Sequence, residues 1–206
     1  IRFRDGVKSV TRSIQDALSV LGIPKRRVAE AVRLGYEAQA DFTAKMLEMG
    51  RLALSRLDKS DQKGVIVIGR PYNLHDDGMN LSVPRKLRDY YGVNCLPLDC
   101  LDTDPIDVAD VNDNMFWALG RRALAAAKMV HDRDNLHIIY ITNFKCGPDS
   151  FITHFIRRAS GKPFLTLQFD GHSNDAGTMT RCEAYLDSIS VLRPWRREQL
   201  APVAVS

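Results

Sequence analysis

A chain of 206 residues, of which 45% are hydrophobic and 26% charged, is long enough to bury a core as one large or two small globular domains. Its net charge of +4 is modest and its basic clusters are scattered, which argues against a nucleic-acid partner. No apolar stretch is long enough for a membrane span and no secretory signal is visible, so we expect a cytoplasmic protein with no membrane partner.

The first third of the chain is predicted to be helical. A short helix is expected over 7–21, ended by Gly22 and Pro24, and a long helix from about 25 to 57. A helix of about thirty residues spans roughly 45 Å, which is more than one sheet requires. We expect it to cover the core as an ordinary helix; the alternative is that it braces a neighbouring domain or the second subunit of a homodimer.

From Lys63 onward, predicted strands alternate with predicted helices. The strands are 64–69, 93–98, 136–142 and 163–169, and the helices are 81–91, 115–130, 150–159 and 178–192. This alternation of near-continuous apolar strands with helices predicts an α/β fold. Right-handed crossovers then favour a parallel four-stranded, flavodoxin- or Rossmann-like sheet with flanking helices, preceded by a helical segment. The expected domains are 1–62 (helical), 63–192 (α/β) and 193–206 (C-terminal tail).

Polar residues gather just after each predicted strand. Arg70 follows the first strand, Asp99 and Cys100 the second, the segment 143–147 the third and the segment 170–175 the fourth. Ligands of open α/β sheets bind outside the carboxyl ends of the strands. The sequence therefore predicts a shared site at this edge of the sheet.

Cys146 is the most informative of these residues. It lies between an apolar strand and Pro148, which is typical of the first turn of a helix, and a helix N-terminus stabilises a thiolate. Such a thiolate can bind a metal or a cluster, or act as a nucleophile. A small buried hydrophobic residue is the alternative, because free cysteines are among the most buried residues.

The other three cysteines are Cys95, Cys100 and Cys182. The four form no C-x-x-C pair, and their spacing is that of neither a zinc ribbon nor a ferredoxin cluster. Without a secretion signal, a disulfide framework is not expected. Cys95 and Cys182 are predicted to belong to the core, whereas Cys100 is a secondary candidate ligand because it ends its strand at the same edge as Cys146.

Two further polar residues allow alternative interpretations. Arg70 is suited either to holding a phosphate or carboxylate or to covering the end of the sheet. His172, flanked by Asp170 and Asp175, suits a metal ligand or an acid–base pair, although a hydrogen-bonded turn residue is favoured. The chain lacks G-x-G-x-x-G, Walker A and G-x-S-x-G patterns, which argues against an ATPase or dehydrogenase site within it.

Several ordered blocks of the sequence together point to a known family. They are Gly69–Asn73, Gly78–Asn80 with Pro84–Lys86, Asn114–Trp117, Thr142–Phe144 with Cys146–Phe151, Asp170 with His172 and Asp175–Gly177, and Thr180–Arg181 with Glu183–Ala184 and Leu186–Asp187. In this order they resemble the C-terminal part of the large CoA-substrate-specific enzyme activases. These are multidomain relatives of the activator and dehydratase components of 2-hydroxyglutaryl-CoA dehydratase. The resemblance covers about 63–189 and, more loosely, the helical part before it.

The resemblance implies a role in ATP-driven electron transfer in a 2-hydroxyacyl-CoA dehydratase system. ATP would bind to acetate-kinase/actin-like modules upstream, and a [4Fe–4S] or related iron–sulfur cluster would be held by Cys146 and by ligands in an upstream domain. Asn143 and Gly147 would shape the turn at Cys146. The chain begins with Ile1 rather than Met, so we expect it to be part of a longer polypeptide that is inactive as a fragment.

The same resemblance implies that Arg70, Asp170 and His172 line the cleft around the cluster. The expected partners are the upstream ATPase and cluster-binding domains and a CoA-ester enzyme. Two alternatives remain at this stage. One is a non-catalytic scaffold or binding module that docks CoA or a partner domain, and the other, weaker one is a metal hydrolase centred on His172.

Overall fold

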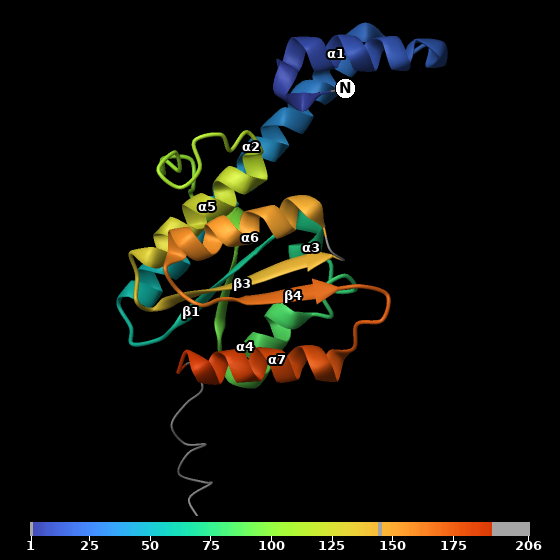
Figure 1. Ribbon diagram of the computed structural model, residues 1–206. Helices are drawn as coiled ribbons and strands as arrows, with labels where there is room; N and C mark the ends of the chain where they lie inside the picture. Colours follow the sequence, from blue (N-terminus) through green and yellow to red (C-terminus); the bar gives the residue numbers. More distant parts are fainter. Residues whose placement is uncertain (1, 144–145, 191–206) are drawn as a thin grey trace, which may run out of the picture. The chain divides into compact units, whose positions relative to one another are not determined.

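The computed structural model describes residues 2–143 and 146–190 (Figure 1). The chain divides into two compact units, Ile1–Met49 and the residues from Gly50 onward. This division falls within one long helix. The domain boundary expected from the sequence lies later, at residue 62. Phe144, Lys145, the predicted tail 193–206 and the end of the helix predicted to reach residue 192 lie outside the described residues. None of the helices in the described part combines the length and apolarity needed to cross a membrane.

The first unit is a pair of helices with a small core of its own. It contains η1 (Phe3–Asp5), α1 (Gly6–Ala17), η2 (Ser19–Leu21) and the first part of α2 (Lys25–Asp58). Gly22 adopts a left-handed conformation with φ 64° at the turn, which glycine accepts at no steric cost. The core consists of Val10, Val28 and Val32, with Ile14, Leu18 and Tyr36 packed against it.

The second unit is built on a four-stranded parallel sheet. Its strands are β1 (Gly64–Gly69), β2 (Asn94–Pro97), β3 (Leu136–Asn143) and β4 (Leu165–Phe169). They pair in the order β2-β1-β3-β4, and every pair is parallel. This order corresponds to the first four strands of the flavodoxin-like layout, so the predicted fold class is confirmed.

Helices cover both faces of this sheet. They are α3 (Pro71–His75), α4 (Val83–Tyr91), α5 (Ala118–His131), α6 (Gly147–Ser160) and α7 (Asp175–Ser188), and η3 (Leu98–Cys100) follows β2. Figure 1 shows α5 and α6 on one face and α4 and α7 on the other, and for α4, α5 and α6 right-handed crossovers require these faces. The short helix α3, which begins at Pro71, was not predicted.

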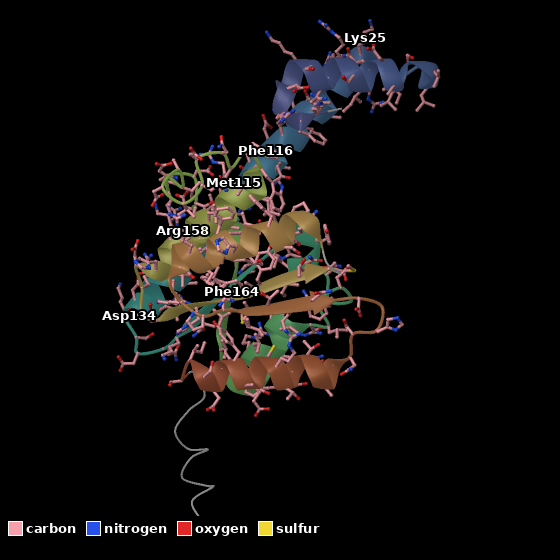
Figure 2. The ribbon with its side chains drawn as sticks, in the orientation of Figure 1. Lys25, Met115, Phe116, Asp134, Arg158 and Phe164 are labelled. Atoms are coloured by element: carbon pink, nitrogen blue, oxygen red, sulfur yellow. The ribbon has the colours of Figure 1, made fainter. Side chains whose placement is uncertain are left out.

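Small residues let α5 pack closely in this core. Ala123, Ala125, Ala126 and Ala127 are all buried, and a Cβ on Gly120 would lie 2.6 Å from Met115 Sδ. Met115 and Phe116, both labelled in Figure 2, precede this helix and differ sharply in their surroundings. Met115 is buried, whereas Phe116 is 97% exposed.

The order of the strands creates a topological switch point between the carboxyl ends of β1 and β3. The chain leaves β1 toward β2 on one side and later returns past β1 to β3 on the other, so the connections from these two neighbouring strands run in opposite directions. Such a switch point is where open α/β sheets bind ligands. Arg70 directly follows β1, and β3 ends at Asn143.

Candidate functional site

Cys146 occupies the N-cap position of α6, three positions after the last residue of β3. Its side chain is partly buried, and its Sγ accepts a hydrogen bond from Arg70 Nη2 at 3.0 Å. The sulfur is therefore neither sealed in apolar packing nor free in solvent. It lies at the switch point, in contact with the charged side chain that follows the neighbouring strand.

Arg70 is held in place by three different groups. Besides Cys146, its Nη2 lies 3.6 Å from Asp149 Oδ1, and its guanidinium lies 5.6 Å from the ring centroid of Trp117. Burial lowers the pKa of Arg70, but the charges of Asp149 and Cys146 raise it further than burial lowers it. The guanidinium thus stays charged beside the sulfur, and Pro71 starts α3 directly after it.

Asp149 anchors this arrangement from within the first turn of α6. The carboxylate is only 2% exposed, and its Oδ2 accepts a hydrogen bond of 2.5 Å from Thr142 Oγ1 at the end of β3. Burial and the neighbouring Asp149 raise the pKa of Tyr140 well above its ordinary value. Sequence reasoning gave Asp149, Thr142 and Trp117 no individual role; they entered only as members of the blocks that carry the resemblance, and Asp149 also as an acidic residue in the first turn of a helix.

Several buried polar atoms near the carboxyl ends of β1 and β3 have no hydrogen-bond partner. Among the described residues these include Asn143 Oδ1, Asp149 Oδ1 and both amide atoms of Asn73, whose side chain is fully buried. Buried polar groups in native proteins are usually paired, so unpaired ones mark a place for water, a ligand or another chain. A Cβ on Gly147 would meet nothing within 4 Å, so packing does not require glycine there.

Asp170 and His172 follow β4, but their contacts are local. Asp170 Oδ1 accepts hydrogen bonds from His172 N and Ser173 Oγ, and both predicted residues are exposed. No hydrogen bond or ion pair among the described residues connects them to Arg70 or Cys146. The structure therefore brings together Arg70, Cys146 and the end of β3, and leaves the 170–173 turn as a self-contained unit beside them.

The remaining cysteines lie in less reactive surroundings. Burial raises the pKa of Cys95 and of Cys182 to about 12, so both are neutral thiols; Cys182 is fully buried, whereas Cys95 is partly buried against the core. Cys100, the secondary candidate, is half-buried in η3, and its pKa is raised by burial and by Asp99. Asp99 itself pairs with His75 and Arg122.

The side chains at this edge of the sheet can supply one ligand of a metal cluster, but not a complete ligand set. Iron–sulfur clusters are commonly held by four cysteine thiolates. Among residues 2–143 and 146–190, no group of three His, Cys, Asp or Glu side chains lies close enough to hold a metal ion. Cys146 with Arg70 is thus a single thiol beside a fixed positive charge, and any cluster would need further ligands from elsewhere.

Comparison with protein families gives a match over the first part of the chain. Residues 1–101, which include the first unit and the segment through β1 and β2, match the family described as CoA enzyme activase uncharacterised domain. The first 101 residues are therefore similar to a domain of the CoA enzyme activases. Neither a curated protein nor a solved structure matches it significantly.

The match supports the relationship inferred from the sequence for residues 1–101. The activase domain model ends at residue 101, so it contains Arg70 and Cys100 but not Cys146 or Asp149. A position in the C-terminal part of an activase was expected from the sequence, and the match does not address it. The activase relationship therefore rests on the part of the chain that supplies the arginine, and the cysteine comes from the segment beyond it.

Proposed function

We propose that this chain is a domain of a CoA-substrate-specific enzyme activase of the 2-hydroxyacyl-CoA dehydratase type, and that Cys146 contributes one ligand to an iron–sulfur site used for ATP-driven electron transfer. The observation that carries the proposal is the 3.0 Å contact between Arg70 Nη2 and Cys146 Sγ at the switch point of the sheet. A partly exposed sulfur beside a positive charge is the state in which cysteine binds metals.

In this proposal the chain supplies one edge of the site. A [4Fe–4S] cluster is the leading candidate, and its other ligands and the ATPase modules belong to upstream domains. When bound, the cluster would supply one-electron chemistry. Arg70 would offset the negative charge of the thiolate, and Asp149 would keep Arg70 oriented. Asn143, with an unpaired buried Oδ1, is available to hydrogen-bond a group that enters the crevice.

Two features support the rest of the proposal. All four cysteines are free thiols, as expected in a reducing cytoplasm. Asp170 and His172 are exposed on the turn after β4, where a partner domain or a CoA-ester enzyme would reach them. They would contact the partner at the edge of the site and would not ligate the cluster.

The test is iron content. We would express the longer polypeptide anaerobically and measure iron and acid-labile sulfide per chain for the wild type, Cys146→Ser and Cys182→Ser. The expected result is loss of iron and of the visible absorption in Cys146→Ser, with Cys182→Ser as the control for a thiol in the core. Undiminished iron in Cys146→Ser would remove the ligand role.

A second candidate is a non-catalytic scaffold that docks CoA or a partner domain. The observation that favours it is that Cys146 already has a hydrogen-bond partner within the chain, so the fold needs no metal to satisfy the sulfur. A scaffold predicts that Cys146→Ser keeps normal affinity for the partner domain, whereas the iron–sulfur proposal predicts loss of iron in that variant.

A further inference from the structure

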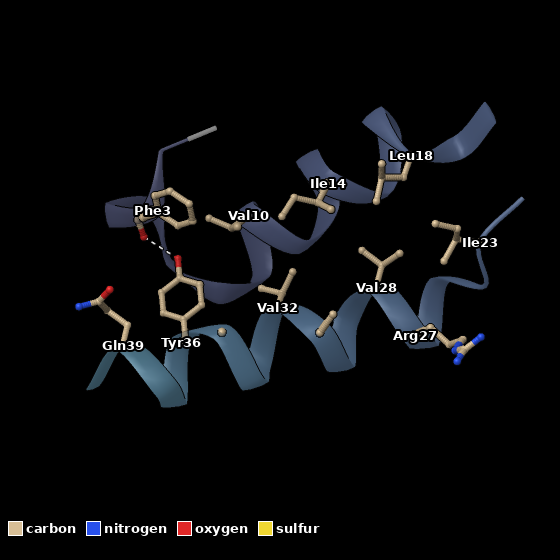
Figure 3. Close-up of a pocket in the computed structure, with 12 residues that line it drawn as sticks. Phe3, Val10, Ile14, Leu18, Ile23, Arg27, Val28, Val32, Tyr36 and Gln39 are labelled. Carbon is tan, nitrogen blue, oxygen red and sulfur yellow. Dashed lines mark hydrogen bonds between the residues drawn. The ribbon is translucent and has the colours of Figure 1, made fainter. Parts of the chain in front are cut away.

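Aromatic side chains hold a neighbouring group in place in both units of the chain. In the first unit Tyr36 Oη donates a hydrogen bond of 2.7 Å to Phe3 O, and the two rings pack edge to face (Figure 3). In the second unit the ring of Trp117 lies beside the guanidinium of Arg70, whose Cζ is 5.6 Å from the ring centroid. The first contact joins η1 to α2, whereas the second reaches the group that touches Cys146.

Trp117 is itself fixed by packing. It occupies the N-cap position of α5 and is partly buried against the core of the second unit. A Cβ on Gly120, in the first turn of α5, would lie 3.0 Å from Trp117 Cε3 and 3.2 Å from Ile152 Cδ1 of α6. The indole therefore lies tightly against the start of α5. Tryptophan attracts a guanidinium over its face more strongly than the other aromatic side chains do, so this ring is suited to orienting an arginine.

Arg70 lies between two acceptors. Its Nη2 donates a hydrogen bond of 3.0 Å to Cys146 Sγ, whereas Asp149 Oδ1 lies 3.6 Å away, which is too far for a hydrogen bond. Among the described residues this Oδ1 has no hydrogen-bond partner, although a carboxylate binds a guanidinium strongly and a cysteine sulfur is a weak acceptor. Asp149 is held at its other oxygen by Thr142 Oγ1. Asp149 alone therefore does not explain where the guanidinium lies.

We propose that Trp117 is a positioning residue for Cys146, because its ring holds the Arg70 guanidinium on the sulfur and keeps it from closing on Asp149. The three contacts of the guanidinium then have separate roles. The carboxylate draws the arginine into this edge of the sheet, the ring fixes where it stops, and the sulfur receives the charge. The consequence for a cluster ligand rests on the proposed function, whereas the consequence for the free thiol does not.

A purely structural role of Trp117 leads to a different expectation. If the ring only fills space beside α5, its loss lowers the stability of the fold and leaves the charge beside Cys146 unchanged. If the ring positions Arg70, its loss lets the guanidinium move toward Asp149 Oδ1 and away from the sulfur. The quantity that separates the two roles is therefore the positive charge at the sulfur.

The experiment compares two alkylating reagents on the full chain at low salt, where charge effects are least screened. Iodoacetate is anionic and iodoacetamide is neutral. Both react with the same thiolate, so the fraction of thiolate cancels from the ratio of their rates. A positive charge at the sulfur favours the anionic reagent. Mass spectrometry of the peptide that carries Cys146 measures both rates separately from those of the other three free cysteines.

Trp117→Leu is expected to lower the ratio of the iodoacetate rate to the iodoacetamide rate at Cys146 by at least about twofold. Trp117→Phe keeps an aromatic face and should retain a ratio closer to that of the wild type. Phe116→Leu changes the adjacent phenylalanine, which is 97% exposed, and is the matched control that should leave the ratio unchanged. Arg70→Met gives the ratio expected when the charge is absent.

Two results would overturn the proposal. An unchanged ratio in Trp117→Leu, with a lower ratio in Arg70→Met, would mean that the arginine keeps its position without the ring. An unchanged ratio in Arg70→Met would mean that no charge acts on the sulfur. If circular dichroism shows that Trp117→Leu does not fold, Trp117→Met takes its place with a flexible apolar side chain. None of these rates involves iron, so the iron content of Cys146→Ser tests the proposed function separately.

Discussion

Arg70 and Cys146 are 76 positions apart in the sequence, yet Arg70 Nη2 donates a hydrogen bond of 3.0 Å to Cys146 Sγ. The contact exists because β1 and β3 are parallel neighbours, with Gly69 opposite Ile141, so that the residues after the two strands emerge on the same edge. Strand order, rather than sequence proximity, therefore builds the candidate site.

The first prediction concerns the coupling of Arg70 to Asp149. Replacing Arg70 with Met leaves the 2%-exposed Asp149 carboxylate without its cation, and we expect a loss of about 2–3 kcal/mol in the free energy of unfolding. The measurement is denaturant unfolding. The control is Asp149→Asn, alone and combined with Arg70→Met, because a coupled pair gives a double variant less destabilised than the sum of the single changes. If the two single effects simply add in the double variant, the pair formed by Arg70 Nη2 and Asp149 Oδ1, 3.6 Å apart, is not energetically coupled.

The second prediction concerns Gly50, where α2 passes the end of η3. A Cβ on Gly50 would lie 1.8 Å from the carbonyl oxygen of Cys100, so Gly50→Ala forces the helix or η3 to move. We expect a loss of more than about 3 kcal/mol from the second unit. Gly35→Ala is the matched control in the same helix, since its Cβ would meet nothing within 4 Å. This change should raise the free energy of unfolding by about 0.5–1 kcal/mol, because alanine favours the helix over glycine. Equal effects of the two changes would contradict the packing argument.

The third prediction is the order in which the thiols react. Cys146 should react first with a disulfide reagent at mildly alkaline pH, because it is partly exposed and touches a guanidinium. Cys182, which is fully buried, should react only when the chain unfolds, and Cys95, whose pKa burial raises to about 12, should react more slowly than Cys146. Mass spectrometry of the labelled peptides measures the order. Labelling of Cys182 before Cys146 in the native protein would contradict it.

The sequence predicted the sheet well because the strands are read directly from apolar runs such as 64–69 and 136–142. It also placed Arg70 and Cys146 at one edge, since parallel strands end together. It did not find Asp149 or Trp117, because their roles depend on their contacts with Arg70, which follows the neighbouring strand. For Asp170 and His172 the strand end was correctly located, and the sequence favoured a hydrogen-bonded turn residue at His172, which agrees with the hydrogen bond from His172 N to Asp170 Oδ1.

The last prediction concerns the pH dependence of stability and rests on His137 in β3. Its side chain is 8% exposed, neither ring nitrogen has a hydrogen-bond partner, and burial followed by the charges of Lys63 and Lys162 lowers its pKa to about 4. The folded state therefore disfavours the protonated ring. Below the ordinary pKa of about 6.5 the unfolded chain binds a proton that the folded chain does not, so stability should fall as the pH drops from 6.5 toward 4.

The size of this effect is measurable by unfolding at a series of pH values. We expect a loss of about 1–3 kcal/mol across the window, since each unit of pKa difference corresponds to about 1.4 kcal/mol at most. His137→Gln removes the titrating group and should flatten that part of the curve, whereas His172→Gln, on an exposed turn, should leave it unchanged. A curve for His137→Gln that keeps the wild-type slope would mean that carboxylates, and not the buried imidazole, govern the acid lability of the second unit.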